Sequence, residues 1–458
     1  LLVKPPSIVA PPTRAVAAPT MPAAPDASGI IDQLNRHISA LATTDPDASL
    51  TDLEAFGDIV GDARVVGIGE ATHGTHEFMT MHDRMIRYLI TEHEFRTVEL
   101  EAPAAMIAGL DRYVRGETDD AAAVQDSFGF FSLANTDFWH WVIWLRAYNQ
   151  HADPAAVVRV VGIDPQANRL LAPALIEEYL TPLDADIAAS LAALYQSAQS
   201  ATGTDSAVEQ SQAALAMLLE AEPGLVAASS QQAFDQAAYL AQTIVQDQQL
   251  HFDSSGTTGG PAGLRDKQLA DNVAWVLDHE DPQARIVVWA HNDHVVATQS
   301  PSNAPALVMG GFLREQYGDR YRAIGLSFAS GTYVAYPIGA TSRNPTSYEL
   351  PAPPSDSAAA LFAQLSAPRF LLDVRAVPAT SIAGQWLRSP TVLPSVGAIY
   401  MPNPFQAITI AEAFDALCFI ADTTSIAPLS VDGVPLQLAL PARRNLERAD
   451  GCTSTSRW

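Results

Sequence analysis

Two carboxylates and two histidines lie close together directly after an apolar segment of the chain. They are Glu70, His73, His76 and Glu77. The preceding residues Val65–Ile68 are typical of a buried strand, and the apolar spacing from 78 to 90 predicts a helix. In open α/β sheets, ligands bind where strands end and helices begin, because the loops there converge on a rigid sheet. This turn is therefore predicted to be part of a functional site.

Three other apolar segments also end in ionisable residues. Ile286–Ala290 is followed by His291 and His294. The segment 97–100 leads to Glu101, and the segment 157–163 leads to Asp164. Strand alternation places residue 99, also a glutamate, on the same face as Glu101, which is closer to the strand end. Four such endings in one chain indicate that these side chains share one pocket.

These residue types suit the hydrolysis of an ester by water. That reaction needs a base to take a proton from the attacking water, and donors or positive charge where the carbonyl oxygen becomes negative. Histidine has an ordinary pKa of about 6.5 and offers a neutral imidazole at pH 7. Either Glu70 or Glu101 could fix its tautomer. No G-x-S-x-G segment occurs in the chain, which favours direct attack by water over an acyl-enzyme.

A metal site is the main alternative from the same residues. Histidines and carboxylates bind zinc and other divalent ions. The available ligands would be His73, His291, His294, Glu70 and Glu101. The spacing of His73, His76 and Glu77 matches neither the H-E-x-x-H of zinc proteases nor its inverted form. We expect a site without metal or other cofactor, with a metal-dependent hydrolase and a non-catalytic binding protein as alternatives.

Several segments resemble the erythromycin esterase family. They are GEATHGTHEF from Gly69, the acid Glu101, GIDPQ from Gly162 and AHNDH from Ala290. Further matches outside these segments are the pair Arg265-Asp266, residues 309–328 and residues 414–424. The similarity runs from about residue 30 to 429 in the family's order.

The resemblance implies a carboxylic ester hydrolase that opens a macrolactone, as in inactivation of macrolide antibiotics. His73 would be the general base, and Glu70, Glu101, His291 and His294 would hold the water and the lactone carbonyl. The family usually has a basic residue nine positions after that base. Here the position is His82, with Arg84 two residues further, and either would supply the positive charge.

Three more residues are candidates for contact with the substrate. They are His76, Glu77 and Asp164. Each also has a structural interpretation: His76 as a surface residue, Glu77 as a favourable charge at a helix N-terminus, and Asp164 as a turn or cap residue before proline.

The pattern of segments predicts an α/β protein with a central, largely parallel or mixed sheet and flanking helices. We expect a Pro/Ala-rich leader over 1–28, the α/β domain over 29–445 and a tail over 446–458. A helical insertion at about 168–255 is expected to act as a lid over the strand ends. Its helices are predicted at Asp184–Ser200, Ser206–Glu220 and Gln231–Gln249, and late strands at Phe370–Val374, Gly397–Met401, Ala416–Ile420 and Leu436–Leu440.

Composition limits the partners. The 458 residues carry a net charge of -25 and a pI near 4.6, which argues against binding to nucleic acid. This charge is compatible with a cationic amino-sugar substrate. No run of about eighteen apolar residues is present to span a membrane. A Pro/Ala-rich start without Met indicates either a removed export signal or a trimmed chain, and Cys418 could pair with Cys452 if the tail folds back.

Overall fold

A nine-stranded sheet forms the centre of the protein. The computed structural model describes residues 27–201, 203–251, 263–280, 283–298, 306–338, 344–431 and 434–435. The strand order is β1-β8-β11-β6-β2-β5-β3-β4, with β7 paired to β6. These strands are β1 (Ile38–Ala40), β2 (Val65–Ile68), β3 (Thr97–Pro103), β4 (Arg159–Asp164), β5 (Ile286–Trp289), β6 (Tyr321–Ala335), β7 (Thr346–Glu349), β8 (Arg369–Asp373) and β11 (Ala416–Thr423).

Six neighbouring strands of the sheet run parallel. The parallel pairs join β11, β6, β2, β5, β3 and β4, whereas β1, β8 and β7 pair antiparallel. The four strands predicted to end in ionisable residues are adjacent, in the order β2-β5-β3-β4. Their carboxyl ends therefore lie side by side, and the predicted fold class is confirmed.

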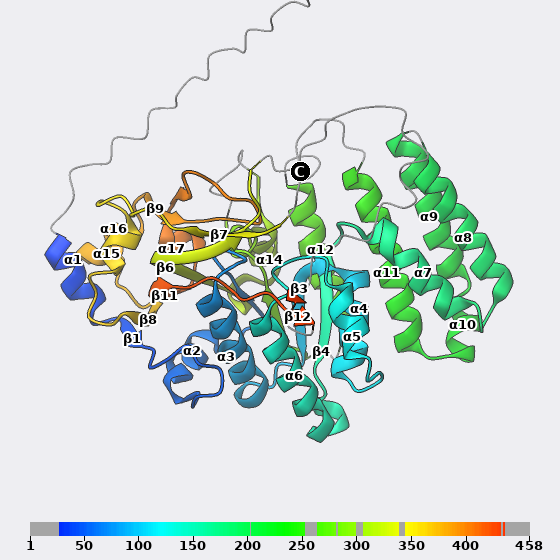
Figure 1. Ribbon diagram of the computed structural model, residues 1–458, viewed down its shortest axis with the longest axis horizontal. Helices are drawn as coiled ribbons and strands as arrows, with labels where there is room; N and C mark the ends of the chain where they lie inside the picture. Colours follow the sequence, from blue (N-terminus) through cyan, green and yellow to red (C-terminus); the bar gives the residue numbers. More distant parts are fainter. Residues whose placement is uncertain are drawn as a thin grey trace, which may run out of the picture.

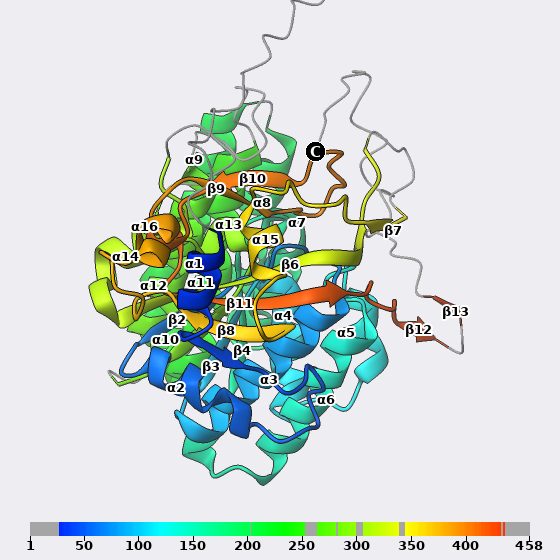
Figure 2. The same cartoon turned by 90° about the vertical axis from the view of Figure 1, so that its left-hand side faces the viewer.

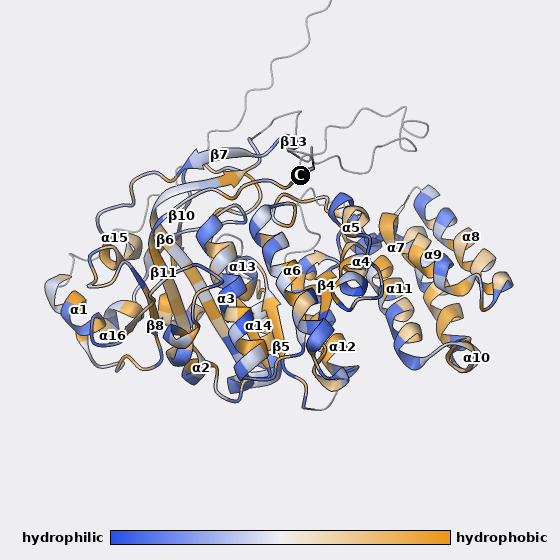
Figure 3. Ribbon diagram, turned by 60° about the horizontal axis from the view of Figure 1, so that its bottom comes forward, coloured by the Kyte–Doolittle hydropathy of each residue, from blue (hydrophilic) through white to orange (hydrophobic). Residues whose placement is uncertain are grey.

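Helices cover both faces of the sheet (Figure 1). Strand alternation divides the buried residues into two cores, with Val66 and Val287 in one and Val65 and Val288 in the other. The first core includes residues of α2 (Glu54–Val60), α3 (His76–Glu92), α4 (Ala104–Val114) and α6 (Thr136–His151). The second includes residues of α12 (Leu264–Asp278) and α14 (Met309–Tyr317). In Figure 3, the strands β4, β5 and β8 are coloured mainly as hydrophobic.

Five consecutive helices form a block at one end of the molecule, beside the β4 edge (Figure 1). They are α7 (Asn168–Leu180), α8 (Ala185–Ser200), α9 (Thr204–Glu220), α10 (Glu222–Ala228) and α11 (Gln231–His251). The block meets the core through α7 and α11, which both contact α4. One of these contacts is a hydrogen bond from the Tyr239 hydroxyl of α11 to the Gly162 carbonyl of β4, at 2.9 Å.

The remaining elements are short. They are α1 (Ala27–Leu34), α5 (Ala121–Ser127), α13 (Asn292–Val295), α15 (Ala358–Phe362), α16 (Ile382–Leu387), α17 (Ile410–Ala413), β9 (Thr391–Pro394), β10 (Phe405–Ile408), β12 (Ser430–Val431) and β13 (Val434–Pro435), with 3-10 turns at Thr51–Leu53, Pro154–Ala156 and Gly318–Arg320. Figure 2 shows α1, α15 and α16 close together at the end where β8, β11 and β6 lie side by side.

Two of the four predicted late strands are present in the structure. Those at Phe370–Val374 and Ala416–Ile420 are confirmed as β8 and β11 of the main sheet. The prediction at Gly397–Met401 was wrong, because that segment makes only one bridge, from Ile399 to Tyr336, and is otherwise irregular. The segment Leu436–Leu440 lies outside the described residues.

The remaining predictions concern the two ends of the chain, its cysteines and a possible membrane span. Residues 1–26 and the tail from 446 lie outside the described residues, whereas Ala27 and Ser28, predicted as leader, begin α1. Cys418 is a buried free thiol, and Cys452 lies outside the described residues. Among the described residues, no helix is long and apolar enough to cross a membrane.

Candidate active site

The turn between β2 and α3 is held by two close backbone approaches. A Cβ added to Gly69 would lie 2.2 Å from Asn292 Oδ1, and one added to Gly74 would lie 2.1 Å from the carbonyl oxygen of Val334. The Asn292 backbone N–H donates to the Glu70 carbonyl at 2.9 Å, and its side chain exchanges hydrogen bonds with the backbone of Leu326. The two glycines therefore let the turn pack against the ends of β5 and β6.

Glu70 and His73 form a hydrogen-bonded pair on this turn. Glu70 Oε1 lies 2.7 Å from His73 Nδ1, and the Trp289 indole N–H donates to Glu70 Oε2 at 3.1 Å. The carboxylate is buried, whereas 18% of the His73 side chain is exposed. His73 Nε2 has no hydrogen-bond partner among the described residues. The pair thus presents one open imidazole nitrogen from a fixed ring.

The surrounding charges favour protonation of His73. Burial opposes the imidazolium, but the hydrogen bond and charge of Glu70, with the charge of Glu101, outweigh it and raise the pKa of His73 above its ordinary value. A base with a raised pKa near the working pH suits general base catalysis. His73 also lies against His291, with ring centroids 5.1 Å apart.

His291 is held by backbone groups at both ring nitrogens. The Asp293 N–H donates to His291 Nδ1 at 3.2 Å, and His291 Nε2 lies 3.3 Å from the carbonyl oxygen of Ala71. Only a neutral ring with its proton on Nε2 satisfies both contacts. Burial also lowers the pKa of His291, in agreement with this neutral tautomer.

Arg265 and His294 form a charged network with three carboxylates. Arg265 pairs with Asp164 at 2.6 Å and with Glu101 at 2.9 Å. His294 Nδ1 lies 2.6 Å from Asp266 Oδ1, and its Nε2 lies 3.2 Å from Glu101 Oε1 and 2.9 Å from Arg265 Nη1. Burial opposes protonation of His294, but Glu101 and Asp266 raise its pKa to about 10 despite the nearby guanidinium. Two partly buried cations therefore lie beside the His73 pair.

The two glutamates of β3 have different surroundings. The Glu101 carboxylate accepts from Arg265 and from the backbone N–H of His291 at 2.8 Å. Burial opposes ionisation of Glu101, but His294, Arg265 and His73 hold its pKa well below the ordinary value. Glu99 is fully buried with no hydrogen-bond partner among the described residues, and burial raises its pKa well above the ordinary value. Of the two, Glu101 therefore lies in the site.

A family model described as erythromycin esterase matches residues 90–423. The match spans well over half of the chain. The chain belongs to the erythromycin esterase family. This relationship implies esterase activity.

Two named relatives come from Escherichia coli. Erythromycin esterase type II is 26% identical over 322 residues, which are 64% of this chain and 75% of that protein. Erythromycin esterase type I is 28% identical over 115 residues, which are 25% of this chain and 27% of that protein.

Solved structures share the fold. A protein from Bacillus cereus has a TM-score of 0.77 at 25% identity. The match covers 88% of this chain and 100% of that chain. A succinoglycan biosynthesis protein has a TM-score of 0.75 at 20% identity, covering 88% and 98% of the two chains. A mutant of the erythromycin esterase EreC in its open conformation has a TM-score of 0.65 at 19% identity, covering 84% and 97%. The last two likenesses concern the fold alone.

Six of the residues predicted for the site lie together. They are Glu70, His73, Glu101, Asp164, His291 and His294, which we call the His73 cluster. The predicted contact of His291 and His294 with the substrate carbonyl requires that they leave existing partners, because all four of their ring nitrogens already lie near other groups.

His82 and Arg84 do not reach the open side of the cluster. His82 is fully buried on α3, its ring nitrogens face the carbonyl oxygens of Phe78 and Ile68, and its ring stacks on Trp289 at 4.4 Å. Burial lowers the pKa of His82, so it is neutral at pH 7. Arg84 binds Asp52 and the carbonyl oxygens of residues 45 and 49. Both side chains are held by these partners, and the positive charge predicted for them stays a prediction.

His76 and Glu77 have partners outside the His73 cluster. His76 Nδ1 lies 2.7 Å from Asp137 on α6, and this pair raises the pKa of His76. The Glu77 carboxylate accepts from the backbone N–H and the hydroxyl of Thr424. Their role in substrate binding stays a prediction.

Arg265 and Asp266 are the site residues that the predicted roles omitted. They lie in the first turn of α12 and bind Glu101, Asp164 and His294. The only sequence signal for them was the Arg-Asp pair shared with the family. Trp289 was also omitted, because its position as the last residue of β5 marked it as core.

Within the described parts of the chain, no three histidine, cysteine, aspartate or glutamate side chains gather in a way that could hold a metal ion. The ring nitrogens of His291 and His294 and the oxygens of Glu101 face protein partners instead. A site that works without a metal stays a prediction.

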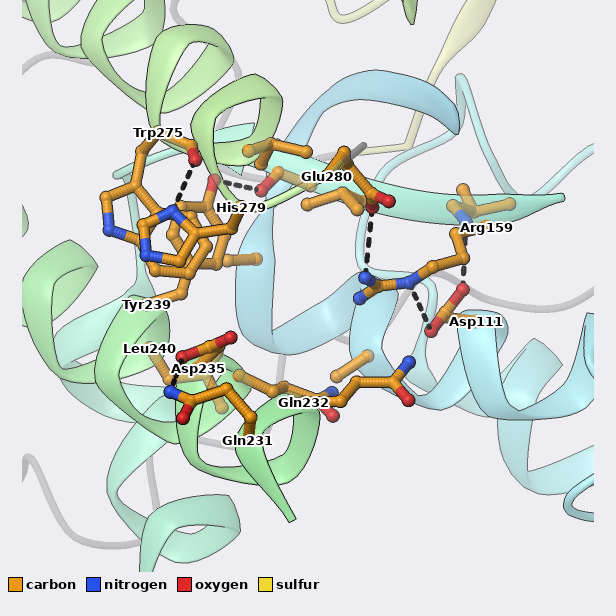
Figure 4. A pocket seen from close by; sticks show the side chains of 17 residues that line it. Asp111, Arg159, Gln231, Gln232, Asp235, Tyr239, Leu240, Trp275, His279 and Glu280 are labelled. Carbon is orange, nitrogen blue, oxygen red and sulfur yellow. Dashed lines mark hydrogen bonds and ion pairs between the residues drawn. The ribbon is translucent and has the colours of Figure 1, made fainter. Parts of the chain in front are cut away.

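A separate cavity of about 280 Å³ lies between the helical block and the core (Figure 4). Arg159 spans it to pair with Glu280 and Asp111, and Tyr239 and Trp275 stack on one side. No residue of the His73 cluster lines this cavity. It is therefore distinct from the candidate active site.

Proposed function

We propose that this protein opens a bulky cyclic ester of the macrolactone type with water activated by His73. The observation that carries the proposal is the open Nε2 of a ring whose Nδ1 is fixed by Glu70 at 2.7 Å. The names of the Escherichia coli relatives support a macrolide as the substrate. The net charge of -25 is compatible with a cationic sugar on that substrate.

In this proposal, a water molecule bound at His73 Nε2 attacks the ester carbonyl carbon. The water proton passes to Nε2 as the new C–O bond forms. Glu70 accepts from Nδ1–H, fixes the tautomer and stabilises the imidazolium that results. The Trp289 N–H holds the second carboxylate oxygen, so that the pair keeps its orientation during turnover. The imidazolium then donates its proton to the leaving alkoxide as the tetrahedral intermediate collapses.

Positive charge for the tetrahedral oxyanion would come from Arg265 and His294. Both are partly buried cations, and the charge of His294 already acts on His73. Positive charge held in such a site stabilises a developing oxyanion, which would take the place of Glu101 beside one of these cations. This assignment replaces His82 and Arg84 in that role.

The substitution His73→Ala tests the proposal. We expect a fall in kcat/KM for erythromycin of about 10²- to 10⁴-fold, the usual contribution of a general base. Folding should be little affected, because the ring is partly exposed and lies on a turn. The matched control is His151→Ala, at the exposed end of α6. Equal turnover in wild type and His73→Ala, with both proteins folded by circular dichroism, would remove His73 as the base.

A further inference from the structure

Three exposed apolar side chains gather on two segments of the chain that lie side by side. Ile338 is 58% exposed, Ile399 is 39% and Met401 is 38%. Tyr336 and Ile399 form a parallel bridge, and the Tyr336 N–H donates to the carbonyl oxygen of Ala398 at 2.8 Å. Bridged residues direct their side chains to the same face. We call Tyr336, Ile338, Ile399 and Met401 the apolar ledge.

Both segments of the ledge begin beside the turn between β2 and α3 that carries His73, which we call the catalytic turn. The Val334 N–H donates to the carbonyl oxygen of Gly74 at 2.9 Å, and the Val396 N–H donates to that of Ala71 at 2.7 Å. These two carbonyls flank His73 on either side. Ile399 lies three residues after Val396, so its backbone is within about 10 Å of the turn, from the strand rise of about 3.3 Å per residue. The backbone of the ledge therefore starts within a few residues of the turn that carries His73.

The ledge differs in charge from the rest of the chain. Residues 331–338 and 395–408 contain no Asp, Glu, Lys, Arg or His, although the whole chain has a net charge of -25. Uncharged apolar surface in so acidic a protein favours contact with an apolar partner, because exposed apolar groups gain free energy when they leave water.

Aromatic side chains pack against the ledge and hold it in place. Tyr400 stacks on Tyr348 of β7 with ring centroids 4.1 Å apart, and Tyr336 meets Phe131 edge to face at 5.0 Å. The Tyr400 N–H also donates to the carbonyl oxygen of Tyr336 at 2.8 Å. A surface fixed in this way loses little conformational entropy when a ligand covers it.

We propose that the apolar ledge binds the hydrocarbon face of the ester substrate and selects large apolar esters over small ones. The inference rests on the proposed function, because the ledge would bind the part of the ester substrate that surrounds the ester bond placed at His73. Continuity with the catalytic turn is the reason for choosing a substrate rather than a protein as the occupant. The interaction acts on binding and leaves the chemistry at His73 unchanged.

The test uses the double variant Ile399→Ser/Met401→Ser. A matched control is Leu219→Ser/Ile382→Ser, because these side chains are 47% and 45% exposed on α9 and α16. Calorimetry measures binding of erythromycin to His73→Ala proteins that carry the ledge change, the control change or neither. Kinetics in the wild-type background compare erythromycin with ethyl acetate, which is too small to reach the ledge.

We expect the ledge variant to bind erythromycin about tenfold more weakly, about 1.4 kcal/mol, while the control binds normally. KM for erythromycin should rise by a similar factor, and kcat/KM for ethyl acetate should not change. Equal affinity in ledge and control variants, or no erythromycin binding by His73→Ala, would overturn the ledge. Binding that depends on the ledge in a wild-type protein that hydrolyses neither ester would overturn only the proposed function.

Discussion

At the scale of single residues, the arrangement divides the acidic and basic roles among similar side chains. His73 has an open nitrogen and a raised pKa, His291 is held neutral between backbone groups, and His294 is held protonated between two carboxylates. Three histidines of one cluster thus have different pKa values, set by their immediate partners. Environments that separate the pKa values of neighbouring groups are typical of acid–base catalysis.

The dependence of the rate on pH follows from Glu70. His73 acts as a base only when neutral, so kcat/KM should fall as pH drops through its raised pKa. In Glu70→Gln, burial and the charge of Glu101 remain but the charge of Glu70 is lost, so the pKa of His73 falls and the acidic limb moves to lower pH. The plateau should fall by on the order of 10²-fold or more, because orienting carboxylates contribute up to about 10⁴-fold in Ser-His-Asp triads.

A pH–rate profile of kcat/KM for both proteins measures this effect. A limb at the same pH in Glu70→Gln and wild type would show that His73 is not the group that titrates. The variant keeps the shape of the side chain but only one of its two oxygens, which can accept from Trp289 or from His73 but not from both.

At the scale of elements, local patterns predicted the strand ends but not all of their neighbours. Glu70 and His73 are three residues apart, so one turn brings them together. Arg265 meets Glu101 across 164 residues of sequence, and only the strand order and the position of α12 join them. His82 and Arg84 were predicted from the position of a basic residue in the family, but α3 directs both into buried contacts. The segment 397–401 has the composition of a strand, yet Ile399 has only one bridging partner.

The contact between Gly69 and Asn292 predicts an effect on stability. Gly69→Ala places a Cβ 2.2 Å from Asn292 Oδ1 and 3.0 Å from its Cα, so the end of β5 must shift. We expect a loss of about 1–3 kcal/mol in the free energy of unfolding, as for overpacking elsewhere. Activity should also fall, because His291 directly precedes Asn292. Unfolding in urea followed by circular dichroism measures the stability.

Gly109→Ala is the matched control for that change. Gly109 lies within α4, where an added Cβ meets no atom within 4 Å. Alanine should therefore stabilise the helix by about 0.5–1 kcal/mol. Equal effects of the two substitutions would contradict the role assigned to the close approach at Gly69.

At the scale of the whole molecule, the sheet order makes one site from distant segments. The strands β2, β5, β3 and β4 lie side by side, so residues from 70 to 294 meet at one edge. The apolar residues of these strands are buried, so the sheet gives the charged cluster a rigid support. The long strand β6 extends past that edge and carries Val334 to the catalytic turn and Tyr336 to the ledge.

The most direct test of the account is mass spectrometry of erythromycin incubated with the protein in ¹⁸O-water, with and without a strong chelator. The account predicts a product that gains one labelled water in both conditions with wild type, and an initial rate at least about 10²-fold lower with His73→Ala. A product that disappears on chelation and returns with a divalent ion would contradict water activation by His73 alone. An unchanged yield from His73→Ala would contradict the central role of that residue.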